Sequence, residues 1–380
     1  MLLNSTMEEI SDSKYILVHY YLESTVSVSD AAWNIAVGQS IGNPKVRNDN
    51  ENNDLIEKHG CKIVPHDFDT NAVTIAFPIE NFKYDSITQL LVAIMGGQLD
   101  IASITKCQIK NISFPHSYKA LFPKSCYGIE GLRRLVGRYN KPLLGGIIKP
   151  KIGMDIATLR GVVEDMLEGG CDIIKEDEIL GSYKLDERIQ MVEKLCEQKP
   201  DFVYLFCNNN IDDYIVDVLP PESGIHINFW AGFNTYQHIS KVNVNHVLFF
   251  QRSGIQILTN SNHDYHIDFY VICKIAALLG VDIMHVGMIG GYSPDKPFNV
   301  LENVAVLQAN DILPSLSCGM HPGLVEGIVR QVGTDFLANV GGAIHGHPGG
   351  TLAGAKAMRQ AIDGTGGKEF DEAINLWGTK

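Results

Sequence analysis

The sequence predicts two α/β domains: an N-terminal ferredoxin-like α+β domain over residues 1–135 and a C-terminal (β/α)₈ TIM barrel over residues 136–380. Two observations lead to this prediction. The chain of 380 residues exceeds one average domain. The pattern also changes near residue 140, from the order strand, helix, strand, strand, helix, strand to strands that alternate with helices. The first order is that of a split βαβ unit, and the second is that of a barrel.

The elements of the first domain follow from the spacing of apolar residues and from helix-capping signals. A segment crowded with Asn, Asp and Lys, residues 43–57, is expected to be a loop. The predicted strands are 15–21, 61–64, 72–77 and 104–112, and the predicted helices run from 29 or 30 to 37 and over 86–95.

The second domain shows eight short apolar segments, several of them separated by amphipathic stretches of helical period. In such a barrel the chemistry gathers at the carboxyl ends of the strands, so those ends are where functional residues are expected. The predicted strands are 144–149, 171–175, 203–207, 224–229, 247–250, 283–285, 312–317 and 336–340. The predicted helices are 155–168, 186–198, 266–279, 297–309, 324–331 and 351–362.

Composition excludes several classes of function. A formal net charge of -13 leaves no basic field for DNA, RNA or an anionic membrane, so the expected partners are small molecules or a second copy of the chain. The 8 cysteines include no CxxC pair, which gives no sign of a zinc or redox site and favours reduced thiols in the cytoplasm. No signal peptide is expected, because residues 1–12 lack a basic region before a long apolar one, and no membrane span is expected, because no apolar run is long enough.

The strand end at 171–178 carries the densest group of ionisable side chains. Alternate residues of a strand share a face, so Lys175 and Asp177 point together, and Glu178 joins them once the chain turns. Two carboxylates are the kind of ligand that magnesium prefers. A desolvated lysine either pairs with them or, as the neutral amine, reacts with carbon dioxide to give a carbamate oxygen donor. The structural alternative is a solvated turn with a salt bridge.

Two other strand ends carry candidate catalytic groups. Lys149 and Lys151 are two residues apart and hence lie on one face of the strand. We expect either that they bind an anion or that one of them, with a lowered pKa, acts as a base. An exposed basic strand end is the alternative reading of that pair. His285 ends the sixth barrel strand and leads into a loop of small residues, 287–291. It is either a catalytic group or a hydrogen-bonded core histidine.

The last two strands deliver glycine-containing loops, with Ser317 and Gly319 after the seventh and Gly341 and Gly342 after the eighth. Loops at these places in a barrel commonly bind phosphate through backbone amides, so a phosphorylated substrate is expected. In the following turn, His345 and His347 either contact a ligand or cap the last predicted helix.

Two motifs, Gly-Gly-Ile-Ile-Lys-Pro-Lys-Ile-Gly at 145–153 and Gly-Gly-Cys-Asp-Ile-Ile-Lys-Glu-Asp-Glu at 169–178, resemble the large subunit of ribulose bisphosphate carboxylase. The resemblance implies one Mg²⁺ per subunit, held by Asp177, Glu178 and Lys175 carbamylated by CO₂. It also implies that Lys149 and Lys151 lie at the reacting centre and that Arg252 binds phosphate. Paired chains, a homodimer, are implied as well, and a small subunit is not.

Four positions depart from that family's pattern. In that family a lysine stabilises the carboxylated intermediate, and this lysine corresponds to Tyr292. The glutamate that pairs with it corresponds to a position at or beside Gly38. An asparagine of the family corresponds to Gly97, and a histidine of the fifth strand to Gln251. A phenol supplies no cation near neutral pH. The chain therefore resembles the non-carboxylating Rubisco-like proteins (form IV), and we expect an enzyme that is not a ribulose bisphosphate carboxylase.

The retained residues are those that enolise a ketone. The resemblance implies magnesium-assisted enolisation or isomerisation of a phosphorylated keto-sugar or diketone, as in the methionine-salvage enolases and isomerases. Decarboxylation of a phosphorylated 3-oxo sugar acid is the second prediction, because it passes through the same type of enolate. A relative without catalysis, kept for binding or regulation, is the alternative of another class.

Overall fold

The computed structural model describes residues 14–46, 49–67, 70–82, 85–208, 214–242, 245–292 and 295–379. Its contacts divide the chain into two compact units. Unit 1 consists of Met1–Pro123 and Gly254–Leu278, and unit 2 of Lys124–Ser253 and Leu279–Lys380. The segment 254–278, which lies far along the sequence, thus clusters with the N-terminal region. The predicted boundary at residue 135 stays a prediction.

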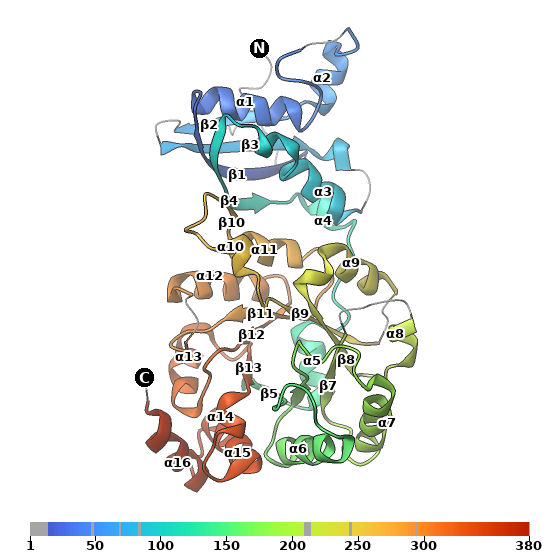
Figure 1. Ribbon diagram of the computed structural model, residues 1–380, viewed down its shortest axis with the longest axis vertical. Coiled ribbons are helices and arrows are strands. Elements are labelled where there is room, and N and C mark those ends of the chain that lie inside the picture. The colour runs from blue at the N-terminus through green and yellow to red at the C-terminus, as the bar shows by residue number, and fades with distance from the viewer. Residues whose placement is uncertain are drawn as a thin grey trace. The chain divides into compact units, whose positions relative to one another are not determined.

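Unit 1 is built on a sheet with the strand order β10-β4-β1-β3-β2, of which the last four strands have the ferredoxin-like order (Figure 1). The predicted N-terminal α+β fold is confirmed. Helix α1 packs on β1, β2 and β3, and the hydroxyl of Tyr20 in β1 donates to the carbonyl of Ile94 at the end of α3 at 2.7 Å. Its elements are β1 (Tyr15–Ser24), α1 (Val28–Gly38), α2 (Asn53–His59), β2 (Lys62–Asp67), β3 (Ala72–Pro78), η3 (Ile79–Phe82), α3 (Ile87–Ile94), η4 (Gly97–Asp100), β4 (Ile104–Ser113), α4 (His116–Lys119), α10 (Gln256–Thr259), β10 (Tyr265–Ile267) and α11 (Phe269–Ala276).

Two elements of unit 1 differ from the sequence predictions. The predicted loop 43–57 is wrong in its second half, because α2 begins at Asn53, capped by the side chain of Asn52, which accepts from the amide of Leu55 at 2.9 Å. The helix predicted from residue 266 begins at Phe269 instead. The residues before it form β10, which pairs in parallel with β4 and extends the sheet.

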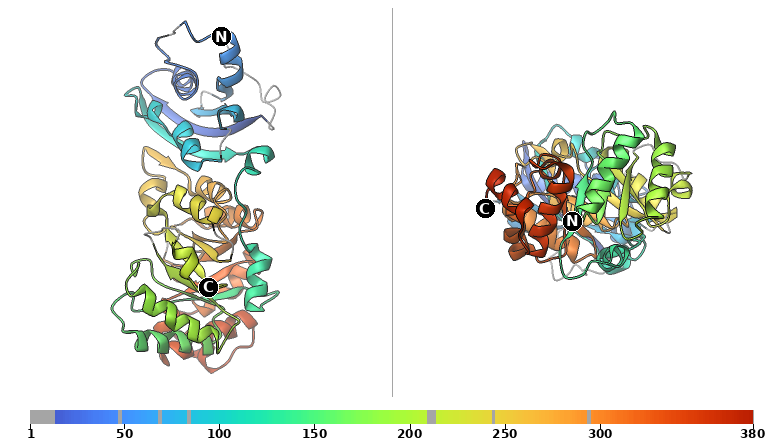
Figure 2. Two further views of the ribbon diagram at one scale, coloured as in Figure 1. Left: turned by 90° about the vertical axis from the view of Figure 1, so that its right-hand side faces the viewer. Right: turned by 90° about the horizontal axis from the view of Figure 1, so that it is seen from below.

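Unit 2 is a closed barrel of parallel strands in the order β11-β12-β13-β5-β6-β7-β8-β9, so the predicted TIM barrel is confirmed. The two views of Figure 2 show its helices around the outside of the strands. Its strands are β5 (Leu143–Ile147), β6 (Ile173–Lys175), β7 (Val203–Cys207), β8 (Gly224–Asn228), β9 (Val247–Gln251), β11 (Ile283–Gly287), β12 (Leu313–Leu316) and β13 (Leu337–Val340). Its helices are α5 (Gly128–Val136), α6 (Ile156–Glu168), α7 (Leu185–Cys196), α8 (Tyr214–Val218), η5 (Phe229–Ala231), α9 (Phe233–Val242), α12 (Pro297–Gln308), η6 (Pro322–Leu324), α13 (Val325–Val332), α14 (Gly342–His345), α15 (Gly350–Asp363) and α16 (Lys368–Trp377).

The amino-terminal half of the barrel is filled with apolar side chains. Leu143, Ile173, Val203 and Leu337 pack there in one buried cluster with residues of the other strands and with α5. Every barrel strand except β8, which has Gly224 beside Val247, contributes an apolar side chain to this cluster. The cluster excludes water and fixes the strands against one another. Because the interior is closed at this end, polar groups that act on a ligand must lie at the opposite, carboxyl ends of the strands.

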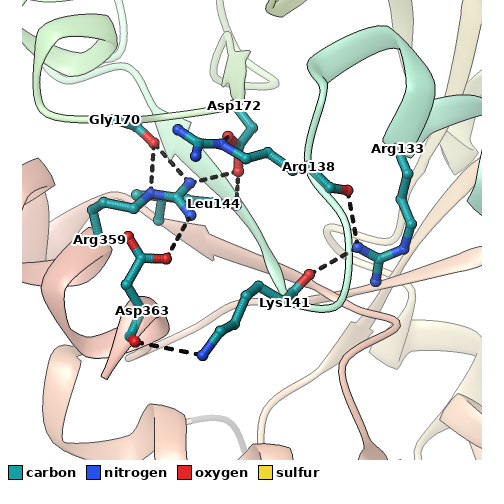
Figure 3. A network of polar contacts seen from close by, with 8 residues as sticks. All are labelled: Arg133, Arg138, Lys141, Leu144, Gly170, Asp172, Arg359 and Asp363. Atoms are coloured by element: carbon teal, nitrogen blue, oxygen red, sulfur yellow. Dashed lines mark hydrogen bonds and ion pairs between the residues drawn. The ribbon is translucent and has the colours of Figure 1, made fainter. Parts of the chain in front are cut away.

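One buried carboxylate ties together the segments at the amino-terminal end of the barrel (Figure 3). Asp172, which directly precedes β6, accepts from Nη2 of Arg359 at 2.6 Å, from Nε of Arg138 at 3.1 Å and from the amide of Leu144 at 2.8 Å. Arg359 also donates to the carbonyl of Gly170. The network joins α15, the segment after α5 and strand β5, and it balances a buried charge with two cations.

Among the described residues, no helix has both the length and the apolar character that crossing a membrane would require.

Candidate active site

All the residues predicted for the site belong to unit 2, and all but His285 lie at the carboxyl ends of barrel strands. Lys149 and Lys151 follow β5, and Lys175 is the last residue of β6, with Asp177 and Glu178 directly after it. Most of the remaining predicted residues follow other strands: Arg252 after β9, Ser317 and Gly319 after β12, and Gly341 and Gly342 after β13. His285 was expected to end its strand but lies in the middle of β11, which continues to Gly287. Their roles remain predictions.

The structure brings the first two strand ends into contact. Nζ of Lys149 lies 2.5 Å from Oδ2 of Asp177, and Nζ of Lys151 lies 3.9 Å from Oδ1 of the same carboxylate. Asp177 is only 3% exposed, so the two cations compensate a buried negative charge. Lys149 therefore has the anionic partner that the sequence analysis expected, and its side chain is 31% exposed.

Lys175 lies inside the barrel, 1% exposed. Its Nζ donates to the backbone carbonyl of Glu176 at 3.0 Å and lies over the ring of Phe249, 5.3 Å from the centroid. Burial lowers the pKa of the Lys175 amine to about 8, and the neighbouring carboxylates of Glu178 and Asp177 oppose that fall. The structure thus holds an amine that loses its proton more readily than an exposed lysine, next to two carboxylates.

Glu176 turns away from this cluster into a buried network of its own. Its carboxylate is bonded to the guanidinium of Arg188, accepts from the hydroxyl of Tyr204 at 2.8 Å and accepts from the amide of Cys207 at 2.6 Å. These bonds fix the backbone at the end of β6 to β7 and α7. Lys175 and Asp177 are the chain neighbours of Glu176. Because Glu176 is held in place, the directions in which their side chains point are fixed as well.

Two further predicted residues are held by partners that the sequence did not indicate. Arg252 forms an ion pair with Asp295 and donates to the carbonyl of Val286 at 3.3 Å. His285 lies 4.0 Å, Nε2 to Sγ, from Cys318. Burial, together with the nearby charges of Arg252 and Lys175, holds the pKa of His285 well below its ordinary value, so its imidazole is neutral.

The glycine loops lie against the catalytic candidates. A Cβ atom at Gly341 would come within 3.3 Å of Cε of Lys149, so glycine lets the lysine side chain lie along this loop. Gly319 has φ +101, a conformation that other residues rarely adopt. The amide of Tyr292 donates to the carbonyl of Cys318 at 3.1 Å, which links the loop after β11 to the loop after β12.

The residues at this site fit a magnesium ion with a carbamylated lysine. In the part of the chain that the structure describes, no three His, Cys, Asp or Glu side chains are grouped so as to hold a metal ion by themselves. Asp177 and Glu178 supply two carboxylates, and a carbamate on the buried Lys175 beside them would supply a third oxygen ligand. That donor set is one that magnesium prefers.

Sequence reasoning missed two residues of the site, Ser253 and Asp295. Ser253 donates from its hydroxyl to Oε1 of Glu178 at 2.8 Å, and Asp295 holds Arg252. Ser253 directly follows Arg252 at a barrel strand end, so its position alone was a readable signal. The salt bridge to Asp295 joins segments 43 residues apart, which periodicity does not reveal.

The predicted capping role of His345 and His347 is wrong. Helix α15 begins at Gly350 and has no side-chain cap. His345 bonds through Nε2 to the carbonyl of Ile147 at 2.9 Å. His347 bonds through Nε2 to the carbonyl of Glu369 at 3.0 Å and accepts from the amide of Gly349. Both histidines fasten the loop after β13 to its neighbours, His347 reaching α16.

A two-domain barrel protein with lysines and carboxylates at adjacent strand ends is the class that this fold and site define. Residues 6–118 match the family model of the ribulose bisphosphate carboxylase large chain N-terminal domain. Residues 128–201 and 209–374 match the model of its catalytic domain. The chain therefore belongs to the family of the ribulose bisphosphate carboxylase large chain, and the resemblance stated from its motifs is confirmed.

Relatives and solved structures agree with this assignment. The ribulose bisphosphate carboxylase of Pyrococcus furiosus is 26% identical over 403 residues, covering 96% of this chain and 94% of that protein. The dimeric archaeal Rubisco of Hyperthermus butylicus has a TM-score of 0.87 and 25% identity, covering 100% of this chain and 99% of that one. A rubisco-like protein from Alicyclobacillus acidocaldarius, 22% identical, shares the fold with a TM-score of 0.82, covering 97% of this chain and 100% of that one.

These comparisons contradict the prediction that the chain is an enzyme other than a ribulose bisphosphate carboxylase. Relatives such as those from Pyrococcus furiosus and Pyrococcus abyssi bear that name, and the Hyperthermus butylicus structure is a Rubisco. The exclusion depended on four substituted positions, chiefly Tyr292. The side chain of Tyr292 is 82% exposed, so this residue does not fill the site, and its identity alone does not decide which reaction follows.

Proposed function

We propose that the chain is an enzyme that enolises a phosphorylated keto-sugar at the carboxyl end of its barrel, with magnesium and a carbamylated Lys175. The observation that carries this proposal is the contact between two strand ends. Lys149 pairs with the buried Asp177, while the buried Lys175 lies beside Asp177 and Glu178. A cation, two carboxylates and an amine of lowered pKa at one place are typical of proton-abstraction sites.

The residues of the chain have distinct parts in this reaction. Lys175, as carbamate, Asp177 and Glu178 would hold the magnesium ion, which when bound would polarise a substrate carbonyl as a Lewis acid. Nζ of Lys149, whose side chain is 31% exposed, reaches both the site and solvent and is placed to exchange a proton with the carbon beside the carbonyl. The carbamate oxygen of Lys175 is the alternative base.

Phosphate recognition is assigned to the other strand ends. Arg252 supplies a guanidinium, which binds phosphate in a bidentate manner, and its bond to Asp295 sets its direction. The loops at Gly319 and at Gly341 to Gly342 would supply backbone amides that glycine leaves accessible. The amide of Ser317 already donates to the carbonyl of Gly287 at 3.0 Å. A substrate with a phosphate group and a ketone would thus be held at both ends, with His285 as a neutral hydrogen-bonding group between them.

Ribulose bisphosphate is the first substrate to test, because the relatives are named for its carboxylation. Carboxylation beside a ketone starts with enolisation, as isomerisation does, so the two outcomes share the chemistry proposed here. The narrower predictions, a methionine-salvage enolase or isomerase and a decarboxylase, differ in what happens to the enolate. We also propose a cytoplasmic homodimer or dimer-based oligomer, supported by the dimeric Rubisco of Hyperthermus butylicus.

The experiment is a product analysis. The purified protein is incubated with ribulose bisphosphate, and then with phosphorylated ketoses and β-keto acid phosphates, in magnesium and carbon-13 bicarbonate. Carbon and proton NMR identify the products. We expect a substrate to be converted only when magnesium and bicarbonate are both present. Labelled carbon in the product would identify carboxylation, and a rearranged product without label would identify isomerisation. No conversion of any compound would contradict the proposal.

A further inference from the structure

A chain of three side chains leads from strand β9 to the Glu178 carboxylate. The hydroxyl of Ser253 donates to Oε1 of Glu178 at 2.8 Å. Nε2 of Gln251 lies 2.5 Å from Oγ of the same serine and donates to it. A serine hydroxyl has one hydrogen and two lone pairs, so it gives its hydrogen to the carboxylate and receives one from the amide. The direction of both bonds follows from this.

The backbone around Ser253 is anchored separately. Nδ2 of Asn228, at the end of β8, donates to the carbonyl of Ser253 at 3.2 Å. Asn228 and Gln251 are also paired across the β8–β9 ladder. Gln251 is buried, with 5% of its surface exposed. Ser253 lies in the turn directly after β9, and residues at the ends of β8 and β9 bond to its carbonyl and its hydroxyl. Such bonds hold a group in one orientation.

We infer that Ser253, oriented by Gln251, is a positioning residue that fixes the Glu178 carboxylate for metal binding, an inference that rests on the proposed function. The bond to Oε1 sets the plane of the carboxylate. Loss of this bond removes one of the restraints on the Glu178 carboxylate, so part of the metal-binding free energy would be spent on orienting it. Groups that orient metal ligands in this way typically change metal affinity by about 10–100-fold when they are removed.

Gln251 orients the hydroxyl of Ser253. Its amide offers a donor that is always present, whereas an ionisable group would donate only at some pH values. Two consecutive hydrogen bonds that end on a carboxylate strengthen each other in a buried site. Removing the amide is therefore expected to weaken the serine bond without abolishing it, and removing the hydroxyl to eliminate the bond to Glu178.

The test measures metal binding directly. Manganese binding in bicarbonate buffer is followed by electron paramagnetic resonance for the wild-type protein and for the variants Ser253→Ala, Ser253→Thr and Gln251→Met. Ser253→Ala is expected to weaken binding by about 10–100-fold, Gln251→Met by less, and Ser253→Thr, which keeps the hydroxyl, by less than about threefold. The matched control is Ser223→Ala, which removes a buried hydroxyl at the other end of β8 that bonds only to the carbonyl of Pro220 among the contacts described.

The magnesium dependence of the activity is expected to separate the variants in the same order as metal binding does. Ser253→Ala is expected to raise the magnesium concentration needed for half-maximal rate, with kcat at saturating magnesium within a few-fold of wild type. Binding by Ser253→Ala equal to that of the wild type, or equal weakening in Ser253→Thr, would overturn the inference alone. No manganese binding by the wild-type protein would overturn the proposed function as well. Unfolding midpoints of the metal-free variants are compared first, and Gln251→Met carries the test if Ser253→Ala does not fold.

Discussion

Replacing Lys175 by methionine is predicted to stabilise the metal-free protein while it abolishes activity. The ammonium of Lys175 is 1% exposed, and its one described hydrogen bond goes to the carbonyl of Glu176. Keeping a charge in such a place is unfavourable unless an ion pair or a metal site compensates it. Methionine has a similar length, carries no charge and adapts to an irregular core. The lysine is thus retained at a cost in stability.

The magnitude follows from the pKa of the amine. Its fall from 10.5 to about 8 on folding corresponds, at about 1.36 kcal/mol per pH unit, to about 3 kcal/mol at pH 7. The variant loses the bond to the Glu176 carbonyl, which costs about 1–2 kcal/mol. The net gain is therefore about 1–2 kcal/mol, which raises the unfolding midpoint by roughly 2–8 °C in a domain of this size.

The sign of the pH dependence is fixed by the same pKa. The folded value, about 8, lies below the unfolded value of 10.5, so the unfolded chain binds more protons between them. The stability of the wild-type protein therefore rises with pH across that window. The advantage of Lys175→Met is complete below pH 8 and disappears as the pH approaches 10.5.

The assay is calorimetric unfolding at several pH values in magnesium-free, carbon dioxide-free buffer. Lys368→Met, which removes a charge from a side chain that is 82% exposed, is the matched control and is expected to shift the midpoint by little. A Lys175→Met protein less stable than wild type at pH 7, or an advantage that does not change with pH, would refute the reasoning.

Two further variants test other parts of the structure. Asp172→Asn leaves the cations of Arg138 and Arg359 without their buried partner, so we expect a loss of about 3 kcal/mol in unfolding free energy, measured by denaturant titration; an unchanged midpoint would show that the network of Figure 3 is dispensable. Gly341→Ala places a Cβ 3.3 Å from Cε of Lys149, so we expect kcat/KM to fall roughly tenfold with little change in unfolding temperature, and equal kcat/KM would contradict the placement of that lysine.

The barrel was predictable because its signal is local and repeated. Each strand is a short apolar run, and each strand end delivers polar residues to the same rim. That is why Lys149, Lys175 and Asp177, which lie 28 residues or less apart, were expected at one place and are found in contact or close by. Their pairing follows from the neighbouring positions of β5 and β6 in the barrel.

Other features depend on contacts that no local pattern reveals. Strand β10 has three residues and exists because β4 offers it a partner about 160 residues earlier in the chain. The bond from Ser253 to Glu178 joins residues 75 positions apart. Helix α2 is a different case, since its Asn52 cap was readable, but the polar composition around it favoured a loop. The four substituted positions do not exclude carboxylation, because the match to the carboxylase family extends over both domains.

The most direct test of the account is deuterium exchange into ribulose bisphosphate and other phosphorylated ketoses, followed by proton NMR in D₂O. The account predicts uptake at the carbon beside the carbonyl by the wild-type protein when magnesium and bicarbonate are both present. It predicts none with Lys175→Ala, which cannot form the carbamate. Exchange that continues unchanged in Lys175→Ala, or a wild-type protein that exchanges no substrate under these conditions, would contradict the claim that this strand end enolises a phosphorylated ketone.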